Sequence, residues 1–141
     1  MAAVQFSGDS QGMLQRGIPD TVFLADDSAA IRQRINAMLA PRAILVVGEG
    51  ATPQACIDGI LATRPAVVVL DVQLEGGTGL QVLRAVRLAA PNIAFVIFSN
   101  HSGPAYRKRY LSAGAARFLD KSTEVDQLAS TIKKVLQHAH S

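Results

Sequence analysis

The sequence contains a single cysteine, Cys56, and no apolar run long enough to cross a membrane. One cysteine cannot form a disulfide within the chain, which argues against an oxidised, secreted scaffold. The longest apolar runs, AILVV, AVVVL and IAFVIF, are far shorter than the roughly 20 residues of a membrane-spanning helix. The first residues, MAAVQFSGDSQGM, lack the basic start and apolar block of a secretory signal. Together these absences predict a cytoplasmic protein that does not contact the membrane.

A strong charge of either sign is also absent. The net charge is +3, and charged residues make up 18% and hydrophobic residues 49% of the 141 residues. This balance is typical of one globular domain and not of a disordered chain. The longest basic cluster, Arg107, Lys108 and Arg109, lies between two tyrosines. Because a run this short is more typical of a solvated helix face than of a nucleic-acid groove, DNA is not expected as a partner.

Regular hydrophobic patterning begins near Thr21. Before it, glycine, serine and proline occur with little periodicity, which predicts a flexible N-terminal extension over residues 1–19 and one folded domain over 20–141. Five short apolar runs then alternate with five segments of helical spacing. The runs are TVFLA, AILVV, AVVVL, IAFVIF and ARFLD, and the helices are expected at Ser28 to Pro41, Pro53 to about Thr63, Gly79 to Ala89, Pro104 to Ser112, and from about Thr123 onward.

The apolar runs are continuous and do not alternate with polar residues. Strands of this kind are typical of a parallel sheet that is covered by helices on both faces. The connections are long enough for right-handed crossover units. The sequence therefore predicts a doubly wound α/β domain with a five-stranded parallel sheet. Ligands of such domains bind beyond the carboxyl ends of the strands, and a strand order of 2-1-3-4-5 would make the first and third strands neighbours.

Residues suited to a shared site follow four of the five predicted strands, whereas the second is followed only by Gly48, Glu49 and Gly50. The suited residues are Asp26 and Asp27 after the first strand, Asp71 after the third, Ser99, Asn100 and His101 after the fourth, and Lys121 after the fifth. Three converging carboxylates repel one another, which predicts a bound cation, and oxygen ligands favour Mg²⁺ or Mn²⁺ over zinc. Lys121 and the Ser99 hydroxyl could then hold phosphoryl oxygens. A carboxylate such as Asp71 can itself accept a phosphoryl group as a nucleophile.

With these residues in place, the chain resembles the receiver domain of two-component response regulators. The matching motifs are VFLADDS, VVVLDVQLEGGTGL, FVIFSN and ARFLDKS, within residues 20–138. Gly79 lies eight residues after Asp71, and Phe118 lies three residues before Lys121. The resemblance implies a CheY-like (βα)5 fold and a phosphorelay protein that signals reversibly. It also implies that Asp71 is the phosphoacceptor, that a histidine kinase or phosphotransfer protein is the donor, and that the domain is not an enzyme.

The same resemblance implies a metal site and a switch. Asp27, Asp71 and the backbone carbonyl of Gln73 would bind Mg²⁺ (or Mn²⁺) directly, and Asp26 would act through water. The switch pair that moves on phosphorylation would be Ser99 and Phe118. Beside the site, Gln73, Asn100 and His101 would modulate it, with His101 as a surface residue and not a catalytic one.

No output domain fits after the fifth predicted helix. We therefore expect the signal to leave through a partner protein, or the chain to be a piece of a longer regulator. We expect the exit to be the face made by the fourth helix, the fifth strand and the fifth helix, because Ser99 and Phe118 border it. This partner face would carry Arg107, Lys108 and Arg109, which suit an acidic protein patch. A second copy of the chain, in a homodimer, is an alternative partner.

Three positions depart from the family pattern. Glu75 stands where the family usually has proline, four residues after the phosphoacceptor, and Ser122 stands where a proline in a cis peptide usually follows the lysine. Asn100 stands where a small residue usually follows the switch hydroxyl. The first two departures predict altered loop geometry. The third predicts a more crowded phosphoryl site with a changed phosphoryl lifetime.

Two other functions stay open. A phosphatase of the haloacid-dehalogenase type also uses Mg²⁺ and an aspartate at a strand end, but it typically has a second acid two residues later, where this chain has Gln73. A receiver-like module that binds partners without phosphorylation is the other alternative, and the complete acidic set argues against it. Turnover of a generic phosphate ester would indicate the phosphatase. Failure to bind Mg²⁺ would indicate the binding module.

Overall fold

Five parallel strands form one sheet, in the order β2-β1-β3-β6-β7. The computed structural model describes residues 20–140, so the predicted extension over 1–19 lies outside the described residues. The strands are β1 (Asp20–Ala25), β2 (Ile44–Gly50), β3 (Val67–Leu70), β6 (Ala94–Ser99) and β7 (Arg117–Asp120). Counted along the chain, these strands stand in the order 2-1-3-4-5. The predicted doubly wound arrangement is confirmed.

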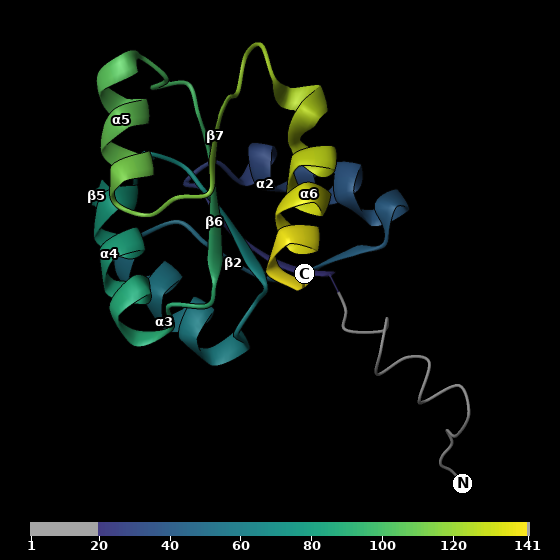
Figure 1. Cartoon of the computed structure of the whole chain (residues 1–141), viewed down its shortest axis with the longest axis horizontal. Helices are drawn as coiled ribbons and strands as arrows, with labels where there is room; N and C mark the ends of the chain where they lie inside the picture. The colour runs from purple at the N-terminus through teal and green to yellow at the C-terminus, as the bar shows by residue number, and fades with distance from the viewer. Residues whose placement is uncertain (1–19, 141) are drawn as a thin grey trace, which may run out of the picture.

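Helices cover both faces of the sheet (Figure 1). One face carries α3 (Pro53–Thr63), α4 (Gly79–Ala89) and α5 (Pro104–Ser112), and the other carries α2 (Ala29–Leu39) and α6 (Leu128–His140). Successive strand residues face opposite layers, so the core divides into two clusters. Phe23 of β1 packs in the cluster under α3 and α4, whereas its neighbour Leu24 packs under α2 and α6.

The last helix begins later than the sequence predicts. A short 3-10 helix, η2 (Val125–Gln127), precedes α6, which starts at Leu128 and not near Thr123. The cause is local, because the Asp120 carboxylate accepts hydrogen bonds from the backbone N–H groups of Ser122 and Thr123, at 2.7 and 3.0 Å. These bonds shape the residues after β7 as a turn and delay the helix.

A small hairpin that the sequence reading did not predict follows β3. Its strands, β4 (Gln73–Leu74) and β5 (Gly77–Thr78), pair in antiparallel fashion. Gly76 at the turn has a φ of 79°, a left-handed conformation that glycine adopts at little cost. The hairpin thus folds the glycine-rich segment back on itself, and the Gly79 N–H donates to the Val72 carbonyl at 2.8 Å, close to the end of β3. None of the helices within residues 20–140 has the length and hydrophobicity to span a bilayer.

Candidate functional site

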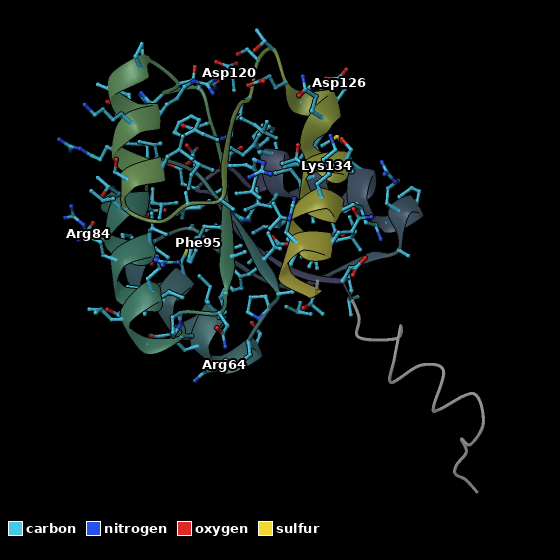
Figure 2. The ribbon with its side chains drawn as sticks, in the orientation of Figure 1. Arg64, Arg84, Phe95, Asp120, Asp126 and Lys134 are labelled. Atoms are coloured by element: carbon cyan, nitrogen blue, oxygen red, sulfur yellow. The ribbon has the colours of Figure 1, made fainter. Side chains whose placement is uncertain are left out.

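The carboxyl ends of β1 and β3 bring three aspartates together. The two strands are neighbours, with Ala25 opposite Leu70, so the residues that follow them converge. Carboxylate oxygens of Asp26, Asp27 and Asp71 all lie within 4.8 Å of one another. Asp26 is 3% exposed and Asp71 7% exposed, whereas Asp27 is exposed. The three predicted carboxylates therefore converge as expected. In Figure 2, Asp120 marks this end of the sheet, and Arg64 lies at the opposite end.

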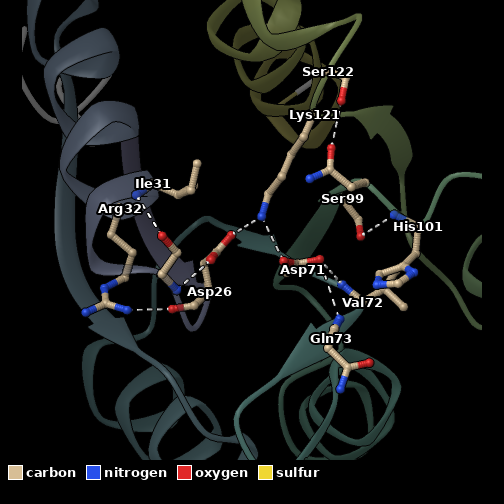
Figure 3. A network of polar contacts seen from close by, with 12 residues as sticks. Asp26, Ile31, Arg32, Asp71, Val72, Gln73, Ser99, His101, Lys121 and Ser122 are labelled. Atoms are coloured by element: carbon tan, nitrogen blue, oxygen red, sulfur yellow. Dashed lines mark hydrogen bonds and ion pairs between the residues drawn. The ribbon is translucent and has the colours of Figure 1, made fainter.

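Asp71 is held from three directions (Figure 3). Its backbone N–H donates to the Ala25 carbonyl at 2.9 Å, which ties the residue to β1. The N–H of Val72 donates to Asp71 Oδ1 at 2.7 Å, and the Lys121 ammonium donates to Asp71 Oδ2 at 2.8 Å. The Gln73 N–H lies 3.5 Å from Oδ1, and the Gln73 side chain is exposed. Asp71 is therefore a strand-end carboxylate in a fixed orientation.

Lys121 reaches the acidic cluster from the end of β7. Its Nζ lies 2.6 Å from Asp26 Oδ2 and 2.8 Å from Asp71 Oδ2, and its side chain is 10% exposed. Burial alone would lower the pKa of this ammonium. The hydrogen bonds and the charges of the two carboxylates outweigh burial and hold the pKa of Lys121 above its ordinary value. The lysine is accordingly charged and bridges two strand ends.

One lysine leaves the cluster short of positive charge. Burial raises the pKa of Asp26, even though Lys121 and the N–H of Ser28 both hydrogen-bond to its carboxylate. The cluster contains three carboxylates but only one ammonium group, and carboxylate oxygens are hard ligands. Such a site gains from an additional cation, and its donor set fits Mg²⁺ or Mn²⁺.

A clamp that the sequence reading missed fixes the backbone of Asp26. The Asp26 N–H donates to the Gly50 carbonyl at 3.0 Å, and Arg32 Nη1 donates to the Asp26 carbonyl at 2.6 Å. Arg32 Nε in turn pairs with Glu49 at 2.8 Å. The strand order could have predicted the pairing of Arg32 with Glu49. The pairing of β1 with β2 places Glu49 opposite Leu24, beside the first turn of α2.

Ser99 and Phe118 are both buried. Ser99 ends β6 and is fully buried, and its hydroxyl accepts a hydrogen bond from the His101 N–H at 3.1 Å. Phe118 of β7 is 6% exposed, and its ring meets the Tyr110 ring edge-on, with 6.2 Å between centroids. The His101 side chain is exposed, with its ring 5.6 Å from that of Tyr106. The structure thus places Ser99 at a strand end next to Asp71 and Phe118 in the core.

The three departures from the family pattern each make a specific contact. Glu75 donates its backbone N–H to the Ala51 carbonyl at 2.9 Å, a bond that proline could not form. The Lys121–Ser122 peptide bond is trans. The Ser122 hydroxyl donates to Asn100 Oδ1 at 2.9 Å. Two of the departures are therefore in contact with each other.

The basic residues of α5 point in different directions. Arg107 is partly buried and bonds within the molecule, to Ser102, Phe118 and Glu124. Lys108 and Arg109 are exposed, and together with Arg84 of α4 they line a shallow groove of about 550 Å³ between α4 and α5. Lys108 and Arg109 are therefore the exposed charges of the predicted partner face, whereas Arg107 bonds to groups within the molecule.

Comparisons with known proteins agree with this geometry. A family model described as the response regulator receiver domain matches residues 22–133. The transcriptional regulatory protein DesR of Bacillus subtilis is 27% identical over 117 residues, which cover 82% of this chain and 58% of DesR. The DNA-binding transcriptional activator DevR/DosR of Mycobacterium tuberculosis is 30% identical over 115 residues, which cover 81% of this chain and 53% of that protein. The chain thus spans about half the length of these curated relatives.

A solved structure extends the likeness to the backbone. A two-component response regulator of the LuxR family from an Aurantimonas species superposes with a TM-score of 0.80 at 27% identity. The match covers 84% of this chain and 85% of that chain. Sequence and fold therefore point to the same family.

Proposed function

The chain belongs to the response regulator receiver domain family of two-component signalling, and on that premise we propose that Asp71 accepts a phosphoryl group in a Mg²⁺-dependent step. The donor would be a histidine kinase or a phosphotransfer protein. One observation carries the proposal: the Asp71 carboxylate is fixed 2.8 Å from the Lys121 ammonium, within a cluster of three aspartates. A nucleophile, a cation site and a charge partner thus meet at one strand end.

Asp26, Asp27 and Asp71 would hold the metal ion. Mg²⁺, when bound, would neutralise these carboxylates and join them to phosphoryl oxygens. The Arg32–Glu49 clamp on the Asp26 carbonyl would support the backbone that carries Asp26. The cluster is therefore formed before the ion arrives.

In the proposed transfer, one oxygen of the Asp71 carboxylate attacks the phosphorus atom of the donor. A new O–P bond forms while the N–P bond of phosphohistidine breaks, and the electron pair of that bond stays with the imidazole nitrogen. The product is an acyl phosphate on Asp71. Lys121 and the hydroxyl of Ser99 are the groups of this chain that would then contact phosphoryl oxygens. Ser99 and Phe118 would carry the response to β6, β7 and α5.

The test uses a small-molecule donor. We expect the protein to gain one phosphoryl group from acetyl phosphate in the presence of Mg²⁺, and none when EDTA removes the ion. Intact-mass spectrometry reads the product directly. A protein that stays unmodified under both conditions would contradict the proposal, and steady turnover of a generic phosphate ester would indicate a phosphatase instead.

Metal binding gives a second prediction. Because Mg²⁺ binds the folded cluster only, a concentration of about 100 times its dissociation constant should stabilise the fold by about 2.7 kcal/mol. Asp27→Ala removes one carboxylate of the cluster and should abolish most of this gain, whereas Asp58→Ala, an exposed aspartate of α3, should keep it. Thermal melting with and without Mg²⁺ measures the difference. An unchanged gain in Asp27→Ala would place the metal elsewhere.

The downstream partner is proposed from the surface charges. Lys108 and Arg109 present positive charge on α5, the helix that follows Ser99 and the β6–α5 loop. Positive charges at an interface rim mainly raise association rate and specificity toward an acidic protein surface. We propose such a surface, on another protein, as the target of the signal. DNA binding is named for DevR/DosR as a whole protein, of which this chain spans 53%.

A further inference from the structure

Side chains tie together the two loops that flank the candidate site. The first loop, residues 99–103, begins at the last residue of β6, and the second, residues 120–124, begins at the last residue of β7. Asn100 Oδ1 accepts a hydrogen bond from the Ser122 hydroxyl at 2.9 Å, and the Ser102 hydroxyl donates to Asp120 Oδ2. Both bonds cross between the loops. A backbone hydrogen bond from the Lys121 N–H to the Ser99 carbonyl, at 3.1 Å, also joins the two loops.

Arg107 adds a third link, from the first turn of α5. Its Nε donates to the Ser102 carbonyl at 2.9 Å, and its Nη1 donates to the Phe118 carbonyl at 3.2 Å. The guanidinium carbon lies 5.0 Å from the centroid of the Phe118 ring, within cation–π range. Its Nη2 reaches Glu124 at 3.4 Å. A single side chain therefore contacts the first loop, the second loop and Phe118.

We propose that these links form a clasp, made by Asn100, Ser102, Arg107, Asp120 and Ser122, that holds the two loops in the arrangement seen here and opposes their response to phosphorylation. The inference rests on the proposed function, because it assigns the clasp a role in phosphoryl transfer to Asp71. The Ser99 hydroxyl is buried and bonded to the His101 N–H. If the Ser99 hydroxyl turns toward a phosphoryl group on Asp71, it gives up that bond, and the first loop is then free to shift with it.

The clasp acts on the relative populations of two loop arrangements. A bond present in only one of two arrangements favours that arrangement, and a phosphoryl group can shift the balance only by its own preference between them. One hydrogen bond of this kind corresponds to a change of about twofold to tenfold in the ratio of the two arrangements. The clasp therefore makes Asn100, Arg107 and Ser122 positioning residues that set how readily the loops move.

The first test needs no phosphoryl donor. Asn100→Ala and Ser122→Ala each remove the same bond, so each should speed hydrogen exchange of the His101 and Lys121 amides by about twofold to tenfold. The double variant should show no more than either single one, because both changes delete one interaction. Asn92→Ala, an exposed asparagine before β6, is the matched control and should leave exchange unchanged.

The second test measures the rate of phosphoryl uptake from acetyl phosphate with Mg²⁺. If the loosened arrangement is the competent one, Asn100→Ala and Ser122→Ala should raise this rate by the factor seen in exchange. Arg107→Lys keeps the charge but loses the planar fork and should act in the same direction, whereas Arg117→Lys, at an exposed arginine of β7, should not.

The outcomes separate the two proposals. Exchange that is unchanged in both single variants overturns the clasp, whatever phosphorylation shows. Faster exchange with an unchanged rate of phosphoryl uptake overturns its role in the response. A parent protein that takes up no phosphoryl group overturns the proposed function and with it that role, while the exchange measurements still support or overturn the link between the loops.

Discussion

Replacing Lys121 with methionine is expected to lower the free energy of unfolding by about 3 kcal/mol at neutral pH without divalent ions. The ammonium is the partner of both Asp26 and Asp71, and the side chains of the three residues are 10%, 5% and 9% exposed. Methionine fills similar volume but leaves two carboxylates facing each other in a site with little water. Urea denaturation followed by circular dichroism measures the loss.

The pH dependence of the same variant gives an internal check. Without Lys121, the Asp26 carboxyl should have a folded-state pKa further above its unfolded value, because burial and the nearby Asp71 charge would no longer be opposed by the ammonium. The folded state then binds more protons than the unfolded state, so the deficit should shrink as the pH falls through the carboxylate range. Mg²⁺ should also reduce the stability deficit of the Lys121 variant. Lys134→Met, at an exposed lysine of α6 (Figure 2), should cost less than about 0.5 kcal/mol, and an equal cost for both variants would contradict the account.

Gly79→Ala should be the other large effect, with a loss of about 3 kcal/mol in the free energy of unfolding. A Cβ at position 79 would lie 2.1 Å from the Asp71 carbonyl oxygen and 3.1 Å from Leu70 Cγ. The obstacle is backbone at the end of β3, and the Gly79 N–H also donates to the Val72 carbonyl at 2.8 Å. The segment after Asp71 must therefore shift, and Mg²⁺ affinity should fall together with stability.

A second glycine provides the control for this substitution. A Cβ at Gly103 would meet no atom within 4 Å, and this residue precedes α5 with a φ of −64°. Gly103→Ala should cost less than about 1 kcal/mol and leave Mg²⁺ binding unchanged. If Gly79→Ala proved as mild as Gly103→Ala, the close approach of α4 to Asp71 would not be what requires glycine at this position.

The sequence was sufficient to predict the parts of the fold and site that depend on strand ends. Continuous apolar runs predict a covered parallel sheet, and the strand order then forces the residues after β1 and β3 to meet. This is why Asp26 and Asp71 could be placed together before their distance was known. The bounds of the helices before α6 followed from local signals, such as the Ser28 hydroxyl that accepts a hydrogen bond from the Ile31 N–H at 3.2 Å.

Contacts between loops could not be predicted in the same way. The bond from Ser122 to Asn100 joins residues 22 positions apart, and neither position has a periodic pattern that indicates a partner. Arg107 reads in the sequence as part of an exposed basic run, and only the packing of α5 against β7 turns its guanidinium over Phe118. Such contacts depend on side-chain directions across loops, which hydrophobic periodicity does not encode.

The central claim is that Asp71, and no other carboxylate, receives the phosphoryl group. Borohydride reduces an acyl phosphate to an alcohol, so treatment of the protein after reaction with acetyl phosphate and Mg²⁺ should convert the phosphorylated aspartate to homoserine. Peptide mass spectrometry should find homoserine at position 71 alone, and Asp71→Asn should yield none. Homoserine at Asp26 or Asp27, or equal phosphoryl uptake by Asp71→Asn, would contradict the account.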